Sequence, residues 1–257
     1  MPTLFFMINF LLDKLKTYQD PLFNFDEESH TYTYAGERFI SVTQFISRFH
    51  EDFDTQFWAD KKAKDRGITV EEIVAEWKEI NDRSNFIGTS THNWIENYFN
   101  KVWQPLPTDL DVIHRINKFN VIYATHLYKL TPVKFEIKIF SKKWKIAGMI
   151  DSIFLYKNKI VIIDHKTNKK FTTDEDKCFG NLLPPFENFK KNHLNEYSIQ
   201  ISLYVLILRE IGINVDVGYL LYIGPDNRPP VLHKCIDMTD ILERYLNELR
   251  NDNVEVS

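Results

Sequence analysis

The chain has 257 residues, 44% of them hydrophobic and 14% aromatic, with a formal net charge of −4. This length fits one large domain, and the net charge excludes a generally basic nucleic-acid binder. The two cysteines, Cys178 and Cys235, exclude a zinc ribbon and a four-cysteine iron–sulfur cluster within the chain. Low cysteine content and the absence of a long apolar run predict a soluble, intracellular protein that does not cross a membrane.

The first part of the chain predicts a helical extension, then a hairpin, then helices. Residues 4–16 are apolar enough to form a helix that packs on the body or on a protein partner. Residues 24–40 alternate as a hairpin that turns at Ala35-Gly36. Two capping boxes, Ser41–Gln44 and Thr69–Glu72, each predict the start of a helix, and residues 56–66 predict a helix with a basic face that ends near Gly67.

A further helix is expected to begin after Gly88. His92 and Glu96 lie one turn apart on it and share a face. A pair at this spacing is most often a surface pair, and a metal-ligand role for the histidine is the alternative. Residues 108–129 then predict a long amphipathic helix.

The most informative stretch is a predicted hairpin with a buried face. After a strand over residues 133–140, two apolar runs at 149–156 and 160–163 are joined by a Lys-Asn-Lys turn. Asp151 and Asp164 interrupt these runs, and Lys166 lies on the same side as Asp164 because side chains alternate along a strand.

A buried carboxylate is costly unless it is paired or bound to a cation. Two of them on adjacent strands, with a lysine beside one, suit a divalent metal ion and a phosphate group. The alternative is a purely structural ion pair between Asp164 and Lys166.

Positive charge is concentrated around this hairpin. Residues 134–170 contain ten lysines and only three acidic residues, a balance that suits a polyanionic substrate. The alternative is that several of these lysines solvate strand edges. In the long polar segment 167–193, lysines interleave with phenylalanines, a combination that either grips single-stranded nucleic acid by charge and stacking or anchors a surface excursion.

The C-terminal part predicts a helix at 194–211, a core strand at 215–222, a weaker strand at 231–236 and a closing helix at 238–250. Gln200 and Tyr204 share a column of the first helix. We expect a single domain over residues 1–257. Its parts are an N-terminal helical extension (1–25), a hairpin and helical part (26–130), a catalytic core (131–222) and a C-terminal strand and helix (223–257).

The order of these motifs resembles the PD-(D/E)xK nuclease superfamily, in its RecB-like branch. Within that branch the chain is most similar to the single-strand exonucleases typified by the mitochondrial genome maintenance exonuclease and its phage relatives. The resemblance covers residues 28 to 222, and it is carried by five elements in order: Gly88-x-x-x-His92-x-x-x-Glu96, a strand with Glu136, Gly148-x-Ile-Asp151, Ile-Ile-Asp164-x-Lys166, and Gln200-x-x-x-Tyr204.

The resemblance implies a restriction-endonuclease-like α/β fold, a mixed central β-sheet flanked by helices, with an N-terminal hairpin and helical elaboration. It implies that Mg²⁺ or Mn²⁺ is the cofactor and that Lys166 is the catalytic lysine. The metal ligands it implies are His92, Asp151, Asp164, the backbone carbonyl of His165, and Glu136 or Glu96 through water. Other implied site residues, which contact the lysine or the nucleic acid, are Gln200, Tyr204, Lys169 and Lys170.

The expected function is therefore metal-dependent exonuclease cleavage of DNA, on single-stranded ends, in replication, repair or recombination of a virus, phage or similar genome. One alternative is a DNA-end-binding recombination scaffold that docks a protein partner through the apolar N-terminus. Another is a structure-specific endonuclease. The chain departs from several RecB-like relatives because it cannot hold their iron–sulfur cluster, and it carries no helicase motif.

Overall fold

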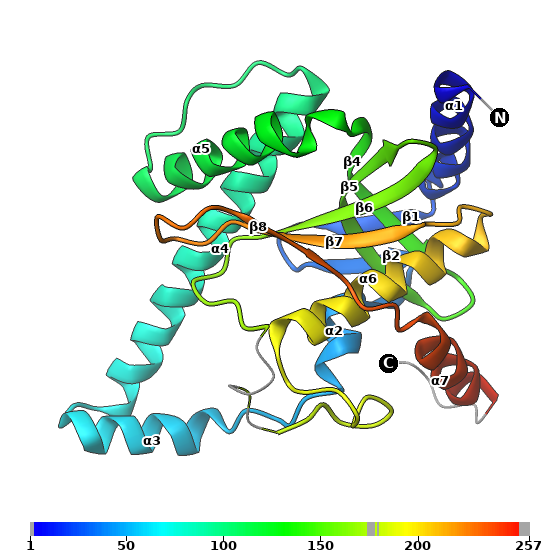
Figure 1. Ribbon diagram of the computed structural model, residues 1–257. Helices are drawn as coiled ribbons and strands as arrows, with labels where there is room; N and C mark the ends of the chain where they lie inside the picture. Colours follow the sequence, from blue (N-terminus) through cyan, green and yellow to red (C-terminus); the bar gives the residue numbers. More distant parts are fainter. Residues whose placement is uncertain (1–2, 174–177, 179, 252–257) are drawn as a thin grey trace.

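A mixed sheet of eight strands with helices on both faces forms the body of the computed structural model, which describes residues 3–173, 178 and 180–251 (Figure 1). The helices are α1 (Leu4–Leu15), η1 (Lys16–Gln19), α2 (Val42–Ser47), α3 (Thr55–Arg66), α4 (Val70–Asn100), α5 (Leu110–Thr125), η2 (Leu127–Lys129), α6 (His193–Glu210) and α7 (Thr239–Asn251). The strands are β1 (Phe23–Asp26), β2 (Thr31–Tyr34), β3 (Glu37–Ser41), β4 (Thr131–Ser141), β5 (Ile146–Tyr156), β6 (Lys159–Lys166), β7 (Val217–Tyr222) and β8 (Val231–Lys234). None of the helices in these described ranges is both long and apolar enough to cross a membrane.

Strand β5 is the point at which the sheet forks. Its first residues pair in parallel with β3, at Ile146 and Ala147, and its last residues pair antiparallel with β6, from Ser152 onward. Strand β4 pairs with the other side of β5 along most of its length. Among the described strands, none pairs with residues 148–151 of β5 on the side of β3 and β6. Asp151 lies in this gap.

The two faces of β6 belong to different layers. Ile162 points into the core that α6 covers, and Ile163 points into the core that α5 covers. Figure 1 shows these two helices on opposite sides of the sheet. Because successive side chains of a strand alternate, Asp164 and Lys166 continue the row toward α6, whereas His165 continues the row toward α5.

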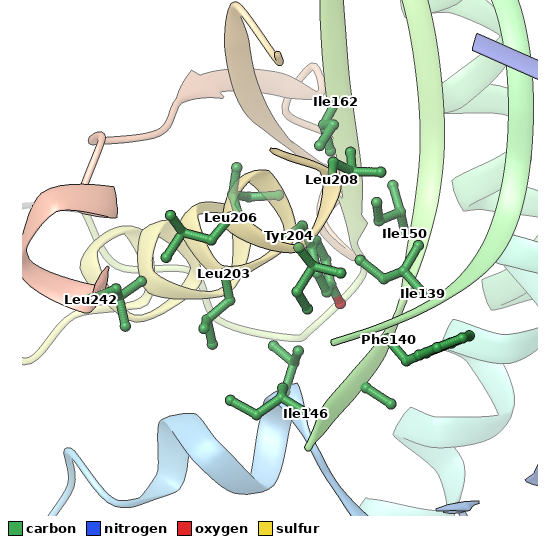
Figure 2. Packing of buried hydrophobic residues seen from close by; sticks show 14 of the residues in the cluster. Ile139, Phe140, Ile146, Ile150, Ile162, Leu203, Tyr204, Leu206, Leu208 and Leu242 are labelled. Carbon is green, nitrogen blue, oxygen red and sulfur yellow. The ribbon is translucent and has the colours of Figure 1, made fainter. Parts of the chain in front are cut away.

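Helix α6 packs closely on β5 because glycine occupies one position of that strand. Figure 2 shows Tyr204 and Leu208 of α6 pointing toward Ile150 of β5. A Cβ atom at Gly148 would lie 2.8 Å from Cε1 of Tyr204 and 2.9 Å from Cγ2 of Val42. Any larger residue at this position would push the tyrosine away from the sheet.

The sequence predicted most of these elements. The capping box at Ser41 is confirmed, since Ser41 Oγ accepts from the Gln44 amide and Gln44 Oε1 accepts from the Ser41 amide, both at 3.1 Å. The helix stop at Gly67 is confirmed by a left-handed φ of 66°. Strand β1 was not predicted as a separate strand, and it extends the N-terminal hairpin to three strands.

The predicted helix start after Gly88 is wrong. Helix α4 runs unbroken from Val70 to Asn100, so Gly88 lies inside it. A Cβ atom at this position would lie 3.4 Å from Oγ1 of Thr167, the residue after β6. The glycine therefore marks a close approach between the helix and the end of β6. It does not mark a helix boundary.

Candidate metal centre

Three side chains from three different elements converge at the fork in the sheet. His92 comes from α4, Glu136 from β4 and Asp151 from β5, and one ligand atom from each lies within 4.8 Å of the others. Nδ1 of His92 is 3.5 Å from Oδ2 of Asp151 and 3.6 Å from Oε1 of Glu136. Oxygen and imidazole ligands in a partly buried group are the donors that a divalent cation such as Mn²⁺ or Mg²⁺ accepts.

The position of Glu136 depends on an irregular backbone. Pairing between β4 and β5 passes from Phe135↔Ser152 to Ile137↔Ile150, so Glu136 lies opposite Asp151. Its φ is 46°, in the left-handed region that a residue other than glycine rarely adopts. Such strain persists where the surrounding structure imposes it, and it concentrates at functional sites. The outlier places a second carboxylate beside Asp151.

The backbone of His165 closes the group from the side of β6. Its amide donates to Oδ2 of Asp151 at 2.6 Å, and its carbonyl oxygen is 3.1 Å from Nε2 of His92. The side chain lies on the α5 side of the strand, edge-on to Phe119 at 5.8 Å between ring centroids, but its Nδ1 is also 3.8 Å from Oδ2 of Asp151. Burial lowers the pKa of His165 well below its usual value. The prediction that the side chain of His165 faces away is wrong in part, because its Nδ1 lies 3.8 Å from Asp151. The role of the carbonyl as a metal ligand stays a prediction.

Lys166 is held by a network on the α6 side of β6. Its Nζ is 2.8 Å from Oδ2 of Asp164 and donates to Oε1 of Gln200 at 3.0 Å. Gln200 Nε2 in turn donates to Oδ1 of Asp164 at 3.1 Å and to the hydroxyl oxygen of Tyr204 at 2.8 Å. Asp164 is 2% exposed and Gln200 6%. The glutamine therefore fixes both the lysine and its carboxylate partner.

Three carboxylates crowd together here, and the imidazole of His92 and the ammonium group of Lys166 are the cationic groups beside them. Burial and the neighbouring carboxylate of Asp164 raise the pKa of Asp151 to about 8. Burial alone would lower the pKa of His92, but the charges of Asp151, Glu136 and Asp164 raise it to about 9. Burial also opposes the charge of Lys166, yet the carboxylate of Asp164 keeps the pKa of the lysine raised. A bound cation would relieve the repulsion among these acids.

The sequence itself matches no family model and no curated protein. Among solved structures, the chain is similar to one described as the crystal structure of SSO0001, with 15% sequence identity and a TM-score of 0.31. That alignment covers 98% of this chain and 87% of the other. A TM-score this low assigns the chain to no family.

The structure thus brings the predicted residues together in two neighbouring groups. His92, Glu136, Asp151 and the His165 carbonyl form the first, while Asp164 belongs with Lys166, Gln200 and Tyr204 in the second. Glu96 lies behind the first group: burial and the charge of Glu136 raise its pKa, and its carboxylate accepts from Asn100 at 3.3 Å. Lys169 and Lys170 are exposed just after β6.

One aromatic residue of the site was missed from the sequence. The ring of Tyr197 lies with its centroid 3.9 Å from Nζ of Lys166. It precedes Gln200 by three residues and Tyr204 by seven, a spacing that places all three on one face of a helix. Tyr197 could have been predicted as a site residue from this spacing.

Phe171 forms a stack of rings beside the site. It stacks on Tyr222 at 4.8 Å and on His233 at 5.0 Å, and more distantly on His193 and Tyr197. Further along the same segment, Phe186 is fully buried and Phe189 packs against the core, so these two anchor the segment. Phe179 lies outside the described residues.

A groove of about 620 Å³ opens next to Lys166, between α4 and the start of α5. Thr167 and Lys169 line it on the side of β6, and Arg83 and Arg115 line it on the side of the helices. Arg115 is 4% exposed, and its guanidinium donates to the carbonyl oxygen of Thr167 at 3.4 Å. Lys166 itself does not line the groove, and acidic side chains line it as well as basic ones: Glu79, Asp82 and Asp111.

Proposed function

We propose that this protein is a metal-dependent deoxyribonuclease with a PD-(D/E)xK site. The observation that carries the proposal is the juxtaposition of a potential cation site, His92, Glu136 and Asp151, with a buried lysine whose position is fixed by Asp164 and Gln200. A structural ion pair alone would account for Asp164 and Lys166. It would not account for two more acids and a histidine gathered beside them at an irregular point of the sheet.

The cation would be held by Asp151, Glu136 and His92, and the carbonyl oxygen of His165 contacts the other ring nitrogen of His92, Nε2. Asp164 is close enough to this space for its charge to raise the pKa of both Asp151 and His92. When bound, Mg²⁺ or Mn²⁺ supplies Lewis acidity toward a phosphoryl oxygen and lowers the pKa of a coordinated water.

The chain's own contribution is a positioned ammonium group. Lys166 is charged, and Asp164 and Gln200 fix its Nζ before any substrate arrives. From there it donates hydrogen bonds to an attacking water and to a phosphate oxygen that gains charge in the transition state. A preorganised donor of this kind needs no rearrangement during the reaction, which makes it effective.

The surroundings support a single nucleic-acid strand as substrate. The chain after Lys166 presents two exposed lysines, Lys169 and Lys170, and Lys169 lines the groove between α4 and α5. The ring stack at Phe171 lies in the same segment. Lysines that follow a backbone and rings that stack on unpaired bases are the usual means of gripping single strands. We therefore propose that the enzyme is an exonuclease that acts on single-stranded DNA ends.

Digestion of end-labelled linear single-stranded DNA with Mn²⁺ or Mg²⁺ tests the proposal. Wild type should degrade the substrate, and Lys166→Met should reduce the rate by at least about 100-fold. Lys16→Ala is the matched control, because Lys16 lies in an exposed pair with Asp13 far along the chain from the site. A circular substrate should survive if an end is required. Equal cleavage by wild type and Lys166→Met would refute the proposal.

One observation favours a second function. Helix α1 leaves an apolar face in solvent, with Phe5 74% exposed and Phe6 62% exposed. A DNA-end-binding scaffold that docks a partner through this face is consistent with it. The same digestion distinguishes a nuclease from a scaffold, because a scaffold binds the oligonucleotide but leaves it intact whichever metal ion is added.

A further inference from the structure

A second hollow lies at the opposite end of β6 from the candidate metal centre. It has a volume of about 660 Å³, within the range of ligand-binding pockets. Its floor is the face of the sheet that carries Val161, Ile163, Val217, Tyr219 and Leu232. These residues stand side by side, since Val161 pairs with Val217 and Ile163 with Tyr219 in neighbouring strands.

This part of the sheet is only partly covered by helix. Helix α5 packs on the sheet through Phe119 and Ile122, and it ends at Thr125. Beyond that point Val217 and Tyr219 remain half-buried. The result is an apolar floor that water reaches, in a protein that otherwise covers both faces of its sheet. We call it the β6–β8 groove.

The rim of the β6–β8 groove is basic. Lys129, Lys157, Lys159 and Lys234 surround the floor, and all four are exposed. None of the four forms an ion pair with any carboxylate of the described residues. The one acid in the lining, Asp216, already accepts the Ile160 amide through Oδ2 at 2.7 Å. The rim is therefore locally positive, although the chain as a whole has a net charge of −4.

We propose that the β6–β8 groove binds an acidic peptide segment of a partner protein, anchored by a bulky apolar side chain. Charge complementarity carries the choice of occupant: the lysines match aspartate or glutamate, and the sheet floor buries a leucine or aromatic side chain. A nucleic-acid backbone would satisfy the lysines but leave the apolar floor, which is aliphatic apart from Tyr219, in water. The lining offers few ring faces for base stacking, unlike the segment around Phe171.

The two sites are separate along β6. Lys159 begins the strand and Lys166 ends it, so about 23 Å of extended chain lies between them at roughly 3.3 Å per residue. The lining reaches as far as Ile163, but none of His92, Glu136 and Asp151 belongs to it, so a peptide in the groove leaves the candidate metal centre open. The consequence is recruitment: the groove would hold the protein beside its partner while the other site acts. This inference does not depend on the proposed nuclease activity.

Fluorescence anisotropy with a labelled peptide tests the proposal, and no cleavage is needed. The probe is a fluorescein-labelled peptide of four aspartates followed by Leu-Phe, titrated with the full chain at low ionic strength in EDTA. We expect micromolar binding that weakens with added salt. The double variant Lys157→Glu/Lys159→Glu should weaken binding by at least about tenfold. The matched control is Lys61→Glu/Lys62→Glu on α3, which also places each lysine near an aromatic ring.

Two further measurements decide the nature of the contact. A peptide with Ser-Ser in place of Leu-Phe should bind at least about tenfold more weakly if the floor takes the apolar anchor. Val217→Ser should have the same effect on the original peptide without altering charge, which guards against misfolding of the charge-reversal variant. No binding of the probe by wild type, equal binding by both double variants, or equal binding of the two peptides would overturn the proposal. So would a groove variant that loses affinity for a metal-free DNA oligonucleotide and keeps affinity for the peptide.

Discussion

The ammonium group of Lys166 lies over the ring of Tyr197, 3.9 Å from its centroid, while Asp164 and Gln200 hold it from the other side. A cation over an aromatic face gains electrostatic energy, most of all where water is excluded. We infer that Tyr197 is a positioning residue: it acts on the reaction through the lysine.

Substitution of Tyr197 tests this role. Tyr197→Ala should lower kcat by about 2- to 30-fold, the range that a cation–π interaction of about 0.5–2 kcal/mol supplies. Tyr197→Phe keeps the ring and should restore most of the rate. If Tyr197 were only structural, Tyr197→Ala would lower the thermal stability. The two variants would then have the same kcat at saturating substrate.

The two glycines that approach other elements should respond differently to alanine. At Gly148 the new Cβ would meet Tyr204 and Val42 below 3.0 Å, so Gly148→Ala should cost about 1–3 kcal/mol of the free energy of unfolding. For a chain of this size that lowers Tm by about 2–4 °C for each kcal/mol.

At Gly88 the nearest atom is 3.4 Å away and the site is inside α4, so the better helix propensity of alanine should keep Tm unchanged or raise it. Thermal unfolding followed by circular dichroism compares the pair. A larger loss at Gly88 than at Gly148 would contradict the packing described for α6.

Without metal, Asp151 should destabilise the protein at neutral and higher pH. Its pKa is raised to about 8 in the folded protein, against about 3.9 in an unfolded chain. The folded state therefore holds a proton that the unfolded state lacks between these values. The stability that this proton supplies is complete below about pH 3.9 and is lost as the pH rises toward 8.

In EDTA, Asp151→Asn should unfold at a higher temperature than wild type at pH 8, and this advantage should shrink toward pH 5. Addition of Mn²⁺ should raise the Tm of wild type more than that of the variant, because a neutral amide ligates the ion more weakly than a carboxylate does. Differential scanning fluorimetry over this pH range measures both effects. A destabilised variant in EDTA would show that the aspartate is stabilised by a contact other than a cation.

The two histidines near the centre should differ in their effect on metal binding. His92 places Nδ1 3.5 Å from Asp151 and 3.6 Å from Glu136, whereas the ring of His165 packs on Phe119 and comes near Asp151 alone, at 3.8 Å. His92→Ala should weaken Mn²⁺ binding by at least about tenfold. His165→Leu keeps the backbone amide and carbonyl and should change it much less. Isothermal titration of Mn²⁺ into each variant separates the roles, and equal losses would mean that the His165 ring also contributes.

Several features of the site were predictable because they follow the periodicity of a single element. Asp164 and Lys166 share a face since strands alternate, and Gln200 and Tyr204 share a face since they are one helical turn apart. The structure places these four in one hydrogen-bonded network. The assignment of that network to nuclease chemistry remains a prediction.

Other features were not predictable because they depend on contacts between distant elements. Glu136 has a left-handed φ within the pairing of β4 with β5. A glutamate in a strand does not predict this conformation. Gly88 suggested a helix start, but tertiary packing against Thr167 is what requires the small residue. The sequence likewise showed nothing of the β6–β8 groove, whose lysines come from three separate segments.

The fork at β5 has a consequence for the order of events during folding. His92 is 73 residues from the carbonyl that it approaches, and Asp151 reaches across the gap that two different strands leave open. No fragment of the chain that lacks α4, the central hairpin or α6 contains both the ligand group and the lysine network. Metal binding at this centre, and the activity proposed for it, therefore require these long-range contacts to be complete.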